Sequence, residues 1–251
     1  MNIIMRNIVF WIGLFVASLL QAALSSDIKV RPVNINLQDK ATLQRGAKFF
    51  MNYCSGCHSL RYLRYNRMAD DLGLTTFDGE LDKDLLVNNL IFTTAKIEDP
   101  IQISMPAADA RQWFGMVPPD LSLTARERGA EWIYTYLKSF YIDNSRPFGS
   151  NNLVVPDVAM PNVLAPLIGQ VVINQQSNRS HLVLGEQGEM NQQQFDSALD
   201  DLVTFLVYAS EPMKLVRYRM GFWVLSFLGL FLIVAYLLKK AYWRDIYGVK
   251  K

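Results

Sequence analysis

The chain has 251 residues, a formal net charge of +2, and hydrophobic side chains at about half of its positions. This length and composition exclude two large domains and fit one modest folded domain with hydrophobic segments at its ends. The small net charge hides unlike regions, because residues 27–212 carry 16 basic and 22 acidic side chains, whereas residues 213–251 carry 8 basic side chains and 1 acidic one. Nucleic acid is not expected among the partners of such an acidic domain.

Residues 1–25 have the pattern of a secretory signal peptide. Arg6 provides the positive start, residues 8–20 are apolar, and Ala23-Leu24-Ser25 is a small-x-small cleavage site. The pattern predicts export of the rest of the chain. An uncleaved N-terminal anchor is the alternative, although the apolar run is short for a full span. A mitochondrial presequence is disfavoured, because those are amphipathic and rich in arginine.

The first predicted helix of the folded domain covers residues 39–53. Leu43, Gly46, Ala47 and Phe50 fall on one face, which leads directly to Cys54. Glycine in the middle of a helix is unfavourable relative to alanine. Gly46 therefore predicts that another backbone approaches this face closely.

The five residues after this helix, Cys54-Ser55-Gly56-Cys57-His58, contain both cysteines of the chain. The pattern is typical of the attachment site of a c-type haem. Two thiols three positions apart can add to the two vinyl groups of one haem, and the histidine after the second thiol can bind the iron. The motif predicts one covalently bound haem c, attached through Cys54 and Cys57 with His58 as an axial ligand.

Two other interpretations of the cysteines are weaker. A dithiol redox switch usually follows a strand and opens a helix, where the thiol pKa is lowered, whereas this pair ends a helical segment. A zinc site could formally use Cys54, Cys57, His58 and His181. Zinc ligands normally come in two spaced pairs, and the adjacent residues Cys57 and His58 chelate a metal poorly.

Two later segments also have helical periodicity, at about residues 129–141 and 192–209, and Pro212 ends the second. Their apolar faces carry Trp132, Tyr136, Leu137 and Phe140 in the first segment, and Phe195, Leu199, Leu202 and Leu206 in the second. Long polar loops are expected between the helices. The predicted fold of residues 26–212 is mainly α, a class I cytochrome c-like haem domain whose terminal helices cross.

An uncharged apolar run from Met220 to Leu238 is close to the roughly 20 residues that cross a bilayer. It predicts a transmembrane anchor over residues 213–238 and a basic tail over residues 239–251. Because the tail carries more Lys and Arg than the segment before the run, the C-terminus is expected in the cytoplasm and the folded domain outside. The signal peptide predicts the same orientation independently.

An electron-carrying haem iron also needs a sixth ligand. The sequence leaves five candidates open: Met105, Met116, Met160, Met190 and His181. Met105 and Met160 each precede a proline, which holds the local chain extended. A methionine sulfur raises the reduction potential relative to a second imidazole.

The order of motifs resembles the cytochrome c1 family, the membrane-anchored haem subunit of ubiquinol:cytochrome c reductase. The resemblance covers about residue 43 to the C-terminus, and its motifs are Cys-Ser-Gly-Cys-His-Ser-Leu at 54–60, Pro-Pro-Asp-Leu-Ser at 118–122, Ala-Met-Pro at 159–161 and Arg-Met-Gly at 219–221 before the anchor. Residues 112–116 depart from the family pattern because they include a bulky Trp-Phe pair.

The resemblance implies that His58 and Met160 are the axial ligands, that Arg126 contacts a haem propionate and that Pro118 belongs to the haem pocket. It also implies a cytochrome b subunit, a Rieske iron–sulfur protein as electron donor and a cytochrome c as acceptor, in a dimeric multisubunit complex. The expected location is a bacterial inner membrane, with the haem domain in the periplasm. The chain itself makes and breaks no substrate bond.

Two rival functions remain at this point. A peroxidase-type haem enzyme needs an open sixth position, and its di-haem form needs a second attachment motif, which this sequence lacks. A freestanding membrane-anchored cytochrome or an oxidase subunit would have a similar haem domain, but the diproline block argues against it. Acidic clusters at residues 70–71, 78–84 and 186–189 suggest electrostatic steering of a basic partner.

Overall fold

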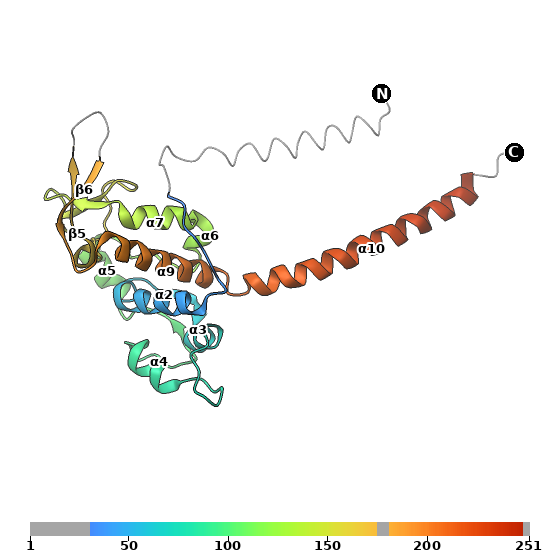
Figure 1. Cartoon of the computed structure of the whole chain (residues 1–251), viewed down its shortest axis with the longest axis horizontal. Coiled ribbons are helices and arrows are strands. Elements are labelled where there is room, and N and C mark those ends of the chain that lie inside the picture. The colour runs from blue at the N-terminus through green and yellow to red at the C-terminus, as the bar shows by residue number, and fades with distance from the viewer. Residues whose placement is uncertain (1–30, 175–180, 248–251) are drawn as a thin grey trace, which may run out of the picture. The chain divides into compact units, whose positions relative to one another are not determined.

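The computed structural model describes residues 31–174 and 181–247, so the predicted signal peptide lies outside the described residues. The described chain is mostly helical, as predicted (Figure 1). Its elements in chain order are α2 Lys40–Tyr53, β1 Leu60–Arg64, α3 Tyr65–Leu72, α4 Lys83–Asn89, β2 Pro100–Ile101, α5 Ala107–Phe114, α6 Thr124–Arg128, α7 Ala130–Lys138, β3 Phe140–Ile142, β4 Ser150–Asn152, α8 Ala165–Ile168, β5 Gly169–Asn174, β6 His181–Gln187, α9 Gln192–Ser210 and α10 Lys214–Tyr247.

Helices α2 and α9 form the centre of the domain. Helix α9 lies between α2 and α7 and packs against both (Figure 1). A Cβ atom on Gly46 of α2 would lie 2.1 Å from the Asp201 carbonyl oxygen of α9, so only glycine fits at this crossing. The close backbone approach predicted for Gly46 is confirmed. The Arg45 Nε atom adds an ion pair with Asp201 Oδ2 at 2.6 Å.

Both helices begin where the sequence supplies a cap. The Asp39 carboxylate accepts hydrogen bonds from the backbone N–H groups of Ala41 and Thr42 at the start of α2. Asn191 and Gln194 form a reciprocal capping box at the start of α9. Such caps each contribute about 1 kcal/mol, and they explain why the predicted boundaries of these two helices were accurate.

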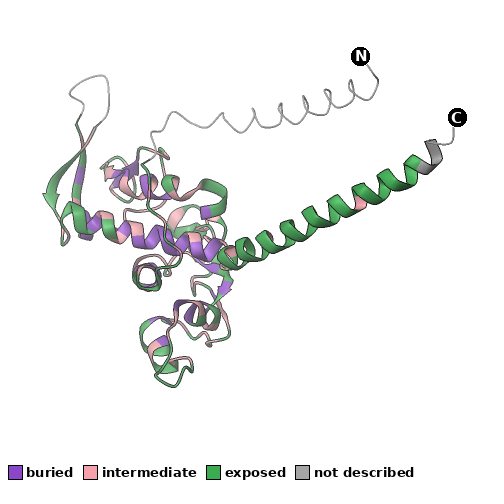
Figure 2. Ribbon diagram, turned by 45° about the vertical axis from the view of Figure 1, so that its right-hand side comes forward, coloured by how far each residue is buried: buried purple, intermediate pink, exposed green. Residues whose placement is uncertain are grey.

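The buried residues between the helices make one hydrophobic core, which Figure 2 shows in purple. Its largest fully buried side chains include Phe50, Phe195, Phe205, Leu199 and Leu202. Each such side chain contributes about 1.5–3 kcal/mol relative to an exposed position. The apolar faces predicted for residues 39–53 and 192–209 therefore meet each other.

Helix α7 ends three residues earlier than the predicted boundary at Tyr141. Phe140 instead begins strand β3, which pairs antiparallel with β4 through Phe140 and Asn152. Pairings β1–β2 and β5–β6 make two more two-stranded antiparallel sheets in the described chain. The long loops expected from the sequence thus contain short strand pairs, and these strands position the loops between the helices.

Helix α10 contains one candidate membrane span, Lys214–Arg244, with a mean hydropathy of 2.3. Its apolar side chains are exposed, as Figure 2 shows in green, which fits contact with lipid rather than with a protein core. Pro212 separates it from α9, as predicted. The helix includes the whole apolar run from Met220 to Leu238 and continues through Lys239 and Lys240.

Candidate functional site

The Cys-x-x-Cys-His segment begins where α2 ends. Cys54 caps the helix, and its carbonyl oxygen accepts hydrogen bonds from the N–H groups of Cys57 at 3.0 Å and His58 at 2.8 Å. The segment is therefore one tight turn. It brings two thiols and one imidazole together on a single short loop that the core helix holds in place.

The two thiols are free and partly exposed. Partial removal from water raises the pKa of the Cys54 thiol to about 12 and also raises the pKa of Cys57. A dithiol switch needs the opposite shift. Among the described side chains no group of three or more His, Cys, Asp or Glu residues could hold a metal ion, and the His181 side chain lies outside them.

His58 is fixed in one tautomer by a backbone contact. Its Nδ1 atom lies 2.8 Å from the Pro119 carbonyl oxygen, which can only accept a hydrogen bond, so Nδ1 carries the proton. The Nε2 lone pair is then available for a metal. Burial lowers the pKa of His58, which favours the neutral imidazole that binds iron.

The diproline block is fastened to the segment that follows His58. The Leu121 N–H donates to the Ser59 carbonyl oxygen at 2.9 Å. The Asp120 carboxylate accepts from the N–H groups of Arg61 and Ser122, both at 2.9 Å. Pro-Pro-Asp-Leu-Ser therefore acts as a bracket that holds the His58 ring through the Pro119 carbonyl. Pro118 is half-buried, and its predicted place in the haem pocket stays a prediction.

Met160 lies in the loop between β4 and α8 and is partly buried. The Tyr136 hydroxyl of α7 donates a hydrogen bond to Met160 Sδ at 3.4 Å. Burial raises the pKa of Tyr136 to about 12, so this hydroxyl keeps its proton at neutral pH. Sequence reasoning placed Tyr136 on a helix face but had no signal for its contact with a sulfur.

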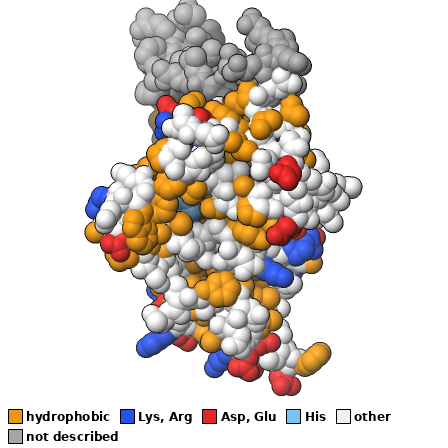
Figure 3. All heavy atoms as spheres, turned by 90° about the vertical axis from the view of Figure 1, so that its left-hand side faces the viewer, with side chains coloured by type: hydrophobic (Ala, Val, Ile, Leu, Met, Phe, Trp, Pro, Cys, Tyr) orange, Lys and Arg blue, Asp and Glu red, His pale blue; other side chains and the backbone are white. Residues whose placement is uncertain are grey.

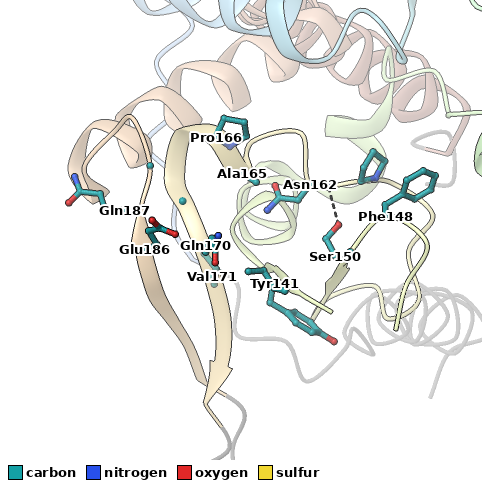
Figure 4. Close-up of a pocket in the computed structure, with 15 residues that line it drawn as sticks. Tyr141, Phe148, Ser150, Asn162, Ala165, Pro166, Gln170, Val171, Glu186 and Gln187 are labelled. Carbon is teal, nitrogen blue, oxygen red and sulfur yellow. Dashed lines mark hydrogen bonds between the residues drawn. The ribbon is translucent and has the colours of Figure 1, made fainter. Parts of the chain in front are cut away.

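Buried polar side chains of β4 hold the loop that carries Met160. Asn152, which is 1% exposed, accepts from the N–H groups of Val154 and Val155 and donates to the Tyr136 carbonyl oxygen at 2.8 Å. Ser150 accepts from the Asn162 N–H at 3.1 Å, the dashed line in Figure 4. The loop is thus held on both sides of Met160.

The other candidate ligands have different settings. Met105 is half-buried before α5, Met116 is 53% exposed, and Met190 packs against the core. His181 begins β6, where its backbone pairs with Asn174. Arg126 is exposed on the short helix α6, and its predicted contact with a propionate stays a prediction.

A cavity of about 340 Å³ lies beside the segment that follows Met160 (Figure 4). Its walls come from β3, β5, β6 and the segment after Met160, and include Tyr141, Phe148, Asn162, Pro166 and Glu186. Neither thiol, His58 nor Met160 lines it. Figure 3 shows hydrophobic side chains gathered on one face of the domain.

The donor set fits a haem c. Two unpaired thiols flank one turn, the adjacent imidazole has its Nε2 lone pair free, and a thioether sulfur lies in a separately braced loop. The domain also exposes large apolar side chains, among them Trp113, Met116, Leu123 and Phe148.

Comparison with known proteins finds a family model and curated relatives that match most of the chain. A model of the Cytochrome C1 family matches residues 34–246. Cytochrome c1 of Allochromatium vinosum is 45% identical, with 97% of this chain and 100% of the relative covered. A protein of Nitrosomonas europaea named ammonia monooxygenase gamma subunit is 41% identical, again over 97% and 100%.

More distant matches include a curated relative and a chain of a solved structure. Cytochrome c1 of Rhodospirillum rubrum is 26% identical over 83% of each chain. A chain of a solved structure titled "Hyperthermophilic respiratory Complex III" aligns with a TM-score of 0.45 at 18% identity, covering 98% of this chain and 99% of its own length.

Proposed function

The chain belongs to the cytochrome c1 family, the electron-transfer subunit of the cytochrome bc1 complex, and from this premise we propose how it holds its redox group. Cys54 and Cys57 bind one haem c through two thioether links, His58 Nε2 is one axial ligand and Met160 Sδ is the other. The observation that carries this proposal is the 2.8 Å contact from His58 Nδ1 to the Pro119 carbonyl, which leaves Nε2 free beside the two thiols.

Bound haem c supplies reversible one-electron chemistry between ferrous and ferric iron. The residues of the chain supply the setting for it. The α2 core and the diproline bracket hold the imidazole in one orientation, and the β4 amides hold the loop that presents the methionine sulfur. Fixed ligands reduce the rearrangement that accompanies electron transfer.

We further propose the partners of this subunit. A Rieske iron–sulfur protein donates the electron, a cytochrome c accepts it, and a cytochrome b subunit lies alongside the anchor in a dimeric complex. Arg126 pairs with a haem propionate, and Pro118 lines the haem pocket next to the Pro119 carbonyl. These assignments rest on the family and on the positions of the matching motifs.

The membrane arrangement of the chain is a further proposal, supported by the described anchor and by the sequence. We propose a cleaved signal peptide at residues 1–25, a periplasmic haem domain at 26–212, an anchor at 213–238 and a cytoplasmic basic tail at 239–251 in a bacterial inner membrane. The exposed apolar surface of α10 supports a membrane span, and the basic residues after it support this orientation.

A second assembly is a different membrane oxidoreductase, as the name of the Nitrosomonas europaea relative suggests. Purification of the tagged full chain in mild detergent distinguishes the two. Copurification of a cytochrome b and a Rieske protein is expected. Recovery of the chain with another oxidoreductase and without these two proteins would contradict the proposed partners but not the proposed haem ligands.

Covalent attachment has its own test. We expect the purified chain to keep its pigment in acidified acetone, because thioether bonds survive acid, and the double variant Cys54→Ala/Cys57→Ala to lose all pigment. The matched control is Ser55→Ala in the same turn, whose hydroxyl bonds only the Met51 carbonyl. Release of pigment from the wild-type chain, or full retention by the double variant, would contradict attachment at these cysteines.

A further inference from the structure

We propose that Tyr136 is a positioning residue that holds the Met160 sulfur through a hydrogen bond to its second lone pair and thereby raises the reduction potential of the haem. The inference rests on the proposed ligation by Met160. The observation behind it is the 3.4 Å contact from the Tyr136 hydroxyl to Met160 Sδ. This distance is within the range of hydrogen bonds to sulfur, which is a weak acceptor.

The Tyr136 ring is held so that its hydroxyl has a fixed direction. It stacks on Trp132 with a centroid distance of 5.1 Å and an interplanar angle of 6°. On its other side it meets the Phe140 ring edge-on at 5.2 Å and 72°. Two aromatic contacts of this kind stabilise one orientation of the ring, so its hydroxyl keeps its direction.

The buried side-chain amide of Asn152 connects the helix that carries Tyr136 to the loop that carries Met160. The Asn152 Nδ2 atom donates to the backbone carbonyl of Tyr136, while its Oδ1 atom accepts from the N–H groups of Val154 and Val155 in the loop that leads to Met160. Asn152 is 1% exposed, so water does not easily replace the hydrogen bonds of its side chain. Helix α7 and the Met160 loop are therefore fixed relative to each other.

The chemistry of a thioether gives the contact its expected effect. The sulfur has two lone pairs, so it can donate one to iron and accept a hydrogen bond with the other. A hydroxyl proton beside the sulfur withdraws electron density and places a positive partial charge near the iron. Both effects disfavour the ferric state, and second-shell hydrogen bonding is an established means of tuning haem potentials.

The test compares the reduction potentials of detergent-solubilised full-chain holoproteins. Tyr136→Phe keeps both ring contacts and removes only the hydroxyl. We expect its potential to fall, with the equilibrium constant for reduction decreasing between about twofold and tenfold, since a weak hydrogen bond is worth about 0.5–1.5 kcal/mol. A tenfold change corresponds to about 59 mV for one electron. The control is Tyr141→Phe, a tyrosine outside this contact, for which no shift is expected.

A double-mutant cycle separates the contact from general effects. In a Met160→Leu background the effect of Tyr136→Phe on the potential should disappear, because the acceptor is gone. An unchanged potential in Tyr136→Phe, a shift equal to that of Tyr141→Phe, or a shift that persists without the sulfur would each overturn the inference. If Met160→Leu keeps the near-infrared band of sulfur-ligated ferric haem, the proposed ligand itself is wrong.

A second variant covers the case in which Tyr136→Phe does not mature. Incorporation of 3-fluorotyrosine at position 136 keeps the size of the ring and makes its hydroxyl a stronger donor. The inference then requires a shift of the potential in the opposite direction, upward, together with a shift of the near-infrared band. A downward shift or no shift would overturn it.

Discussion

The two proposed iron ligands are held by different kinds of structure. His58 follows the end of a core helix by five residues, and one backbone carbonyl orients its ring. Met160 lies in an irregular loop whose position depends on buried side chains of β4 and on a tyrosine of α7. Helix packing thus places one ligand and polar side-chain contacts place the other, so different substitutions should disturb each.

The largest expected effect tests the helix packing behind His58. Gly46→Ala should destabilise the holoprotein by at least about 3 kcal/mol, because the added Cβ would lie 2.1 Å from the Asp201 carbonyl oxygen and must push α2 and α9 apart. The urea midpoint of unfolding in detergent measures the loss. Gly185→Ala is the control, since its Cβ would meet nothing closer than 3.5 Å. Equal midpoints for the two variants would show that the crossing is not tightly packed.

A smaller effect is expected from the loop that carries Met160. Asn152→Ala leaves the N–H groups of Val154 and Val155 and the Tyr136 carbonyl without their side-chain partner, at a cost of about 2 kcal/mol. We also expect external imidazole to bind the ferric haem more tightly, because a loosened loop gives up the sixth position more easily. Spectrophotometric titration with imidazole measures this affinity.

The control for Asn152 is Asn89→Ala, whose exposed side chain bonds only the Leu85 carbonyl. It should leave both the stability and the imidazole affinity unchanged. Asn152→Ala could instead lower stability and leave the imidazole affinity of the ferric haem unchanged. The Asn152 amide would then support the domain without placing Met160, which would contradict the proposed role of polar side chains in holding this ligand.

These differences explain what the sequence could predict. The haem motif, α2, α9 and α10 were predictable because each is a local pattern, either a fixed spacing or a long helical period. The Pro119 carbonyl and the Tyr136–Met160 contact were not, because they join residues 61 and 24 positions apart. Helix α7 ended early for the same reason, since Phe140 pairs with Asn152 across a turn that helical periodicity does not reveal.

The smallest expected effect is a pH dependence of the free energy of unfolding, caused by Asp143 between strands β3 and β4. Hydrogen bonds from Ser145 and Asn151 lower the pKa of Asp143 below its ordinary value of 3.8. The ionised form therefore stabilises the fold above this value, and the contribution is lost as the pH falls from about 3.8 through the lower folded-state pKa. Asp143→Asn should remove this part of the acid sensitivity.

The urea midpoint of unfolding is measured for wild type and Asp143→Asn at a series of pH values that begins at about pH 6. The series extends about three pH units into acid, where carboxylates take up protons. Asp39→Asn is the counterpart at the start of α2, where hydrogen bonds from Thr42 lower the pKa of Asp39 in the same way. The wild-type and Asp143→Asn curves should converge in acid. Curves that stay parallel throughout would show that Asp143 does not hold its loop through its charge.

The most direct test of the account is the identity of the sulfur ligand. Met160 and Met105 are each replaced by leucine in the full chain, and the near-infrared band of the ferric holoprotein is recorded. We expect Met160→Leu to abolish the band and Met105→Leu to leave it in place. Loss of the band in Met105→Leu with retention in Met160→Leu would contradict it.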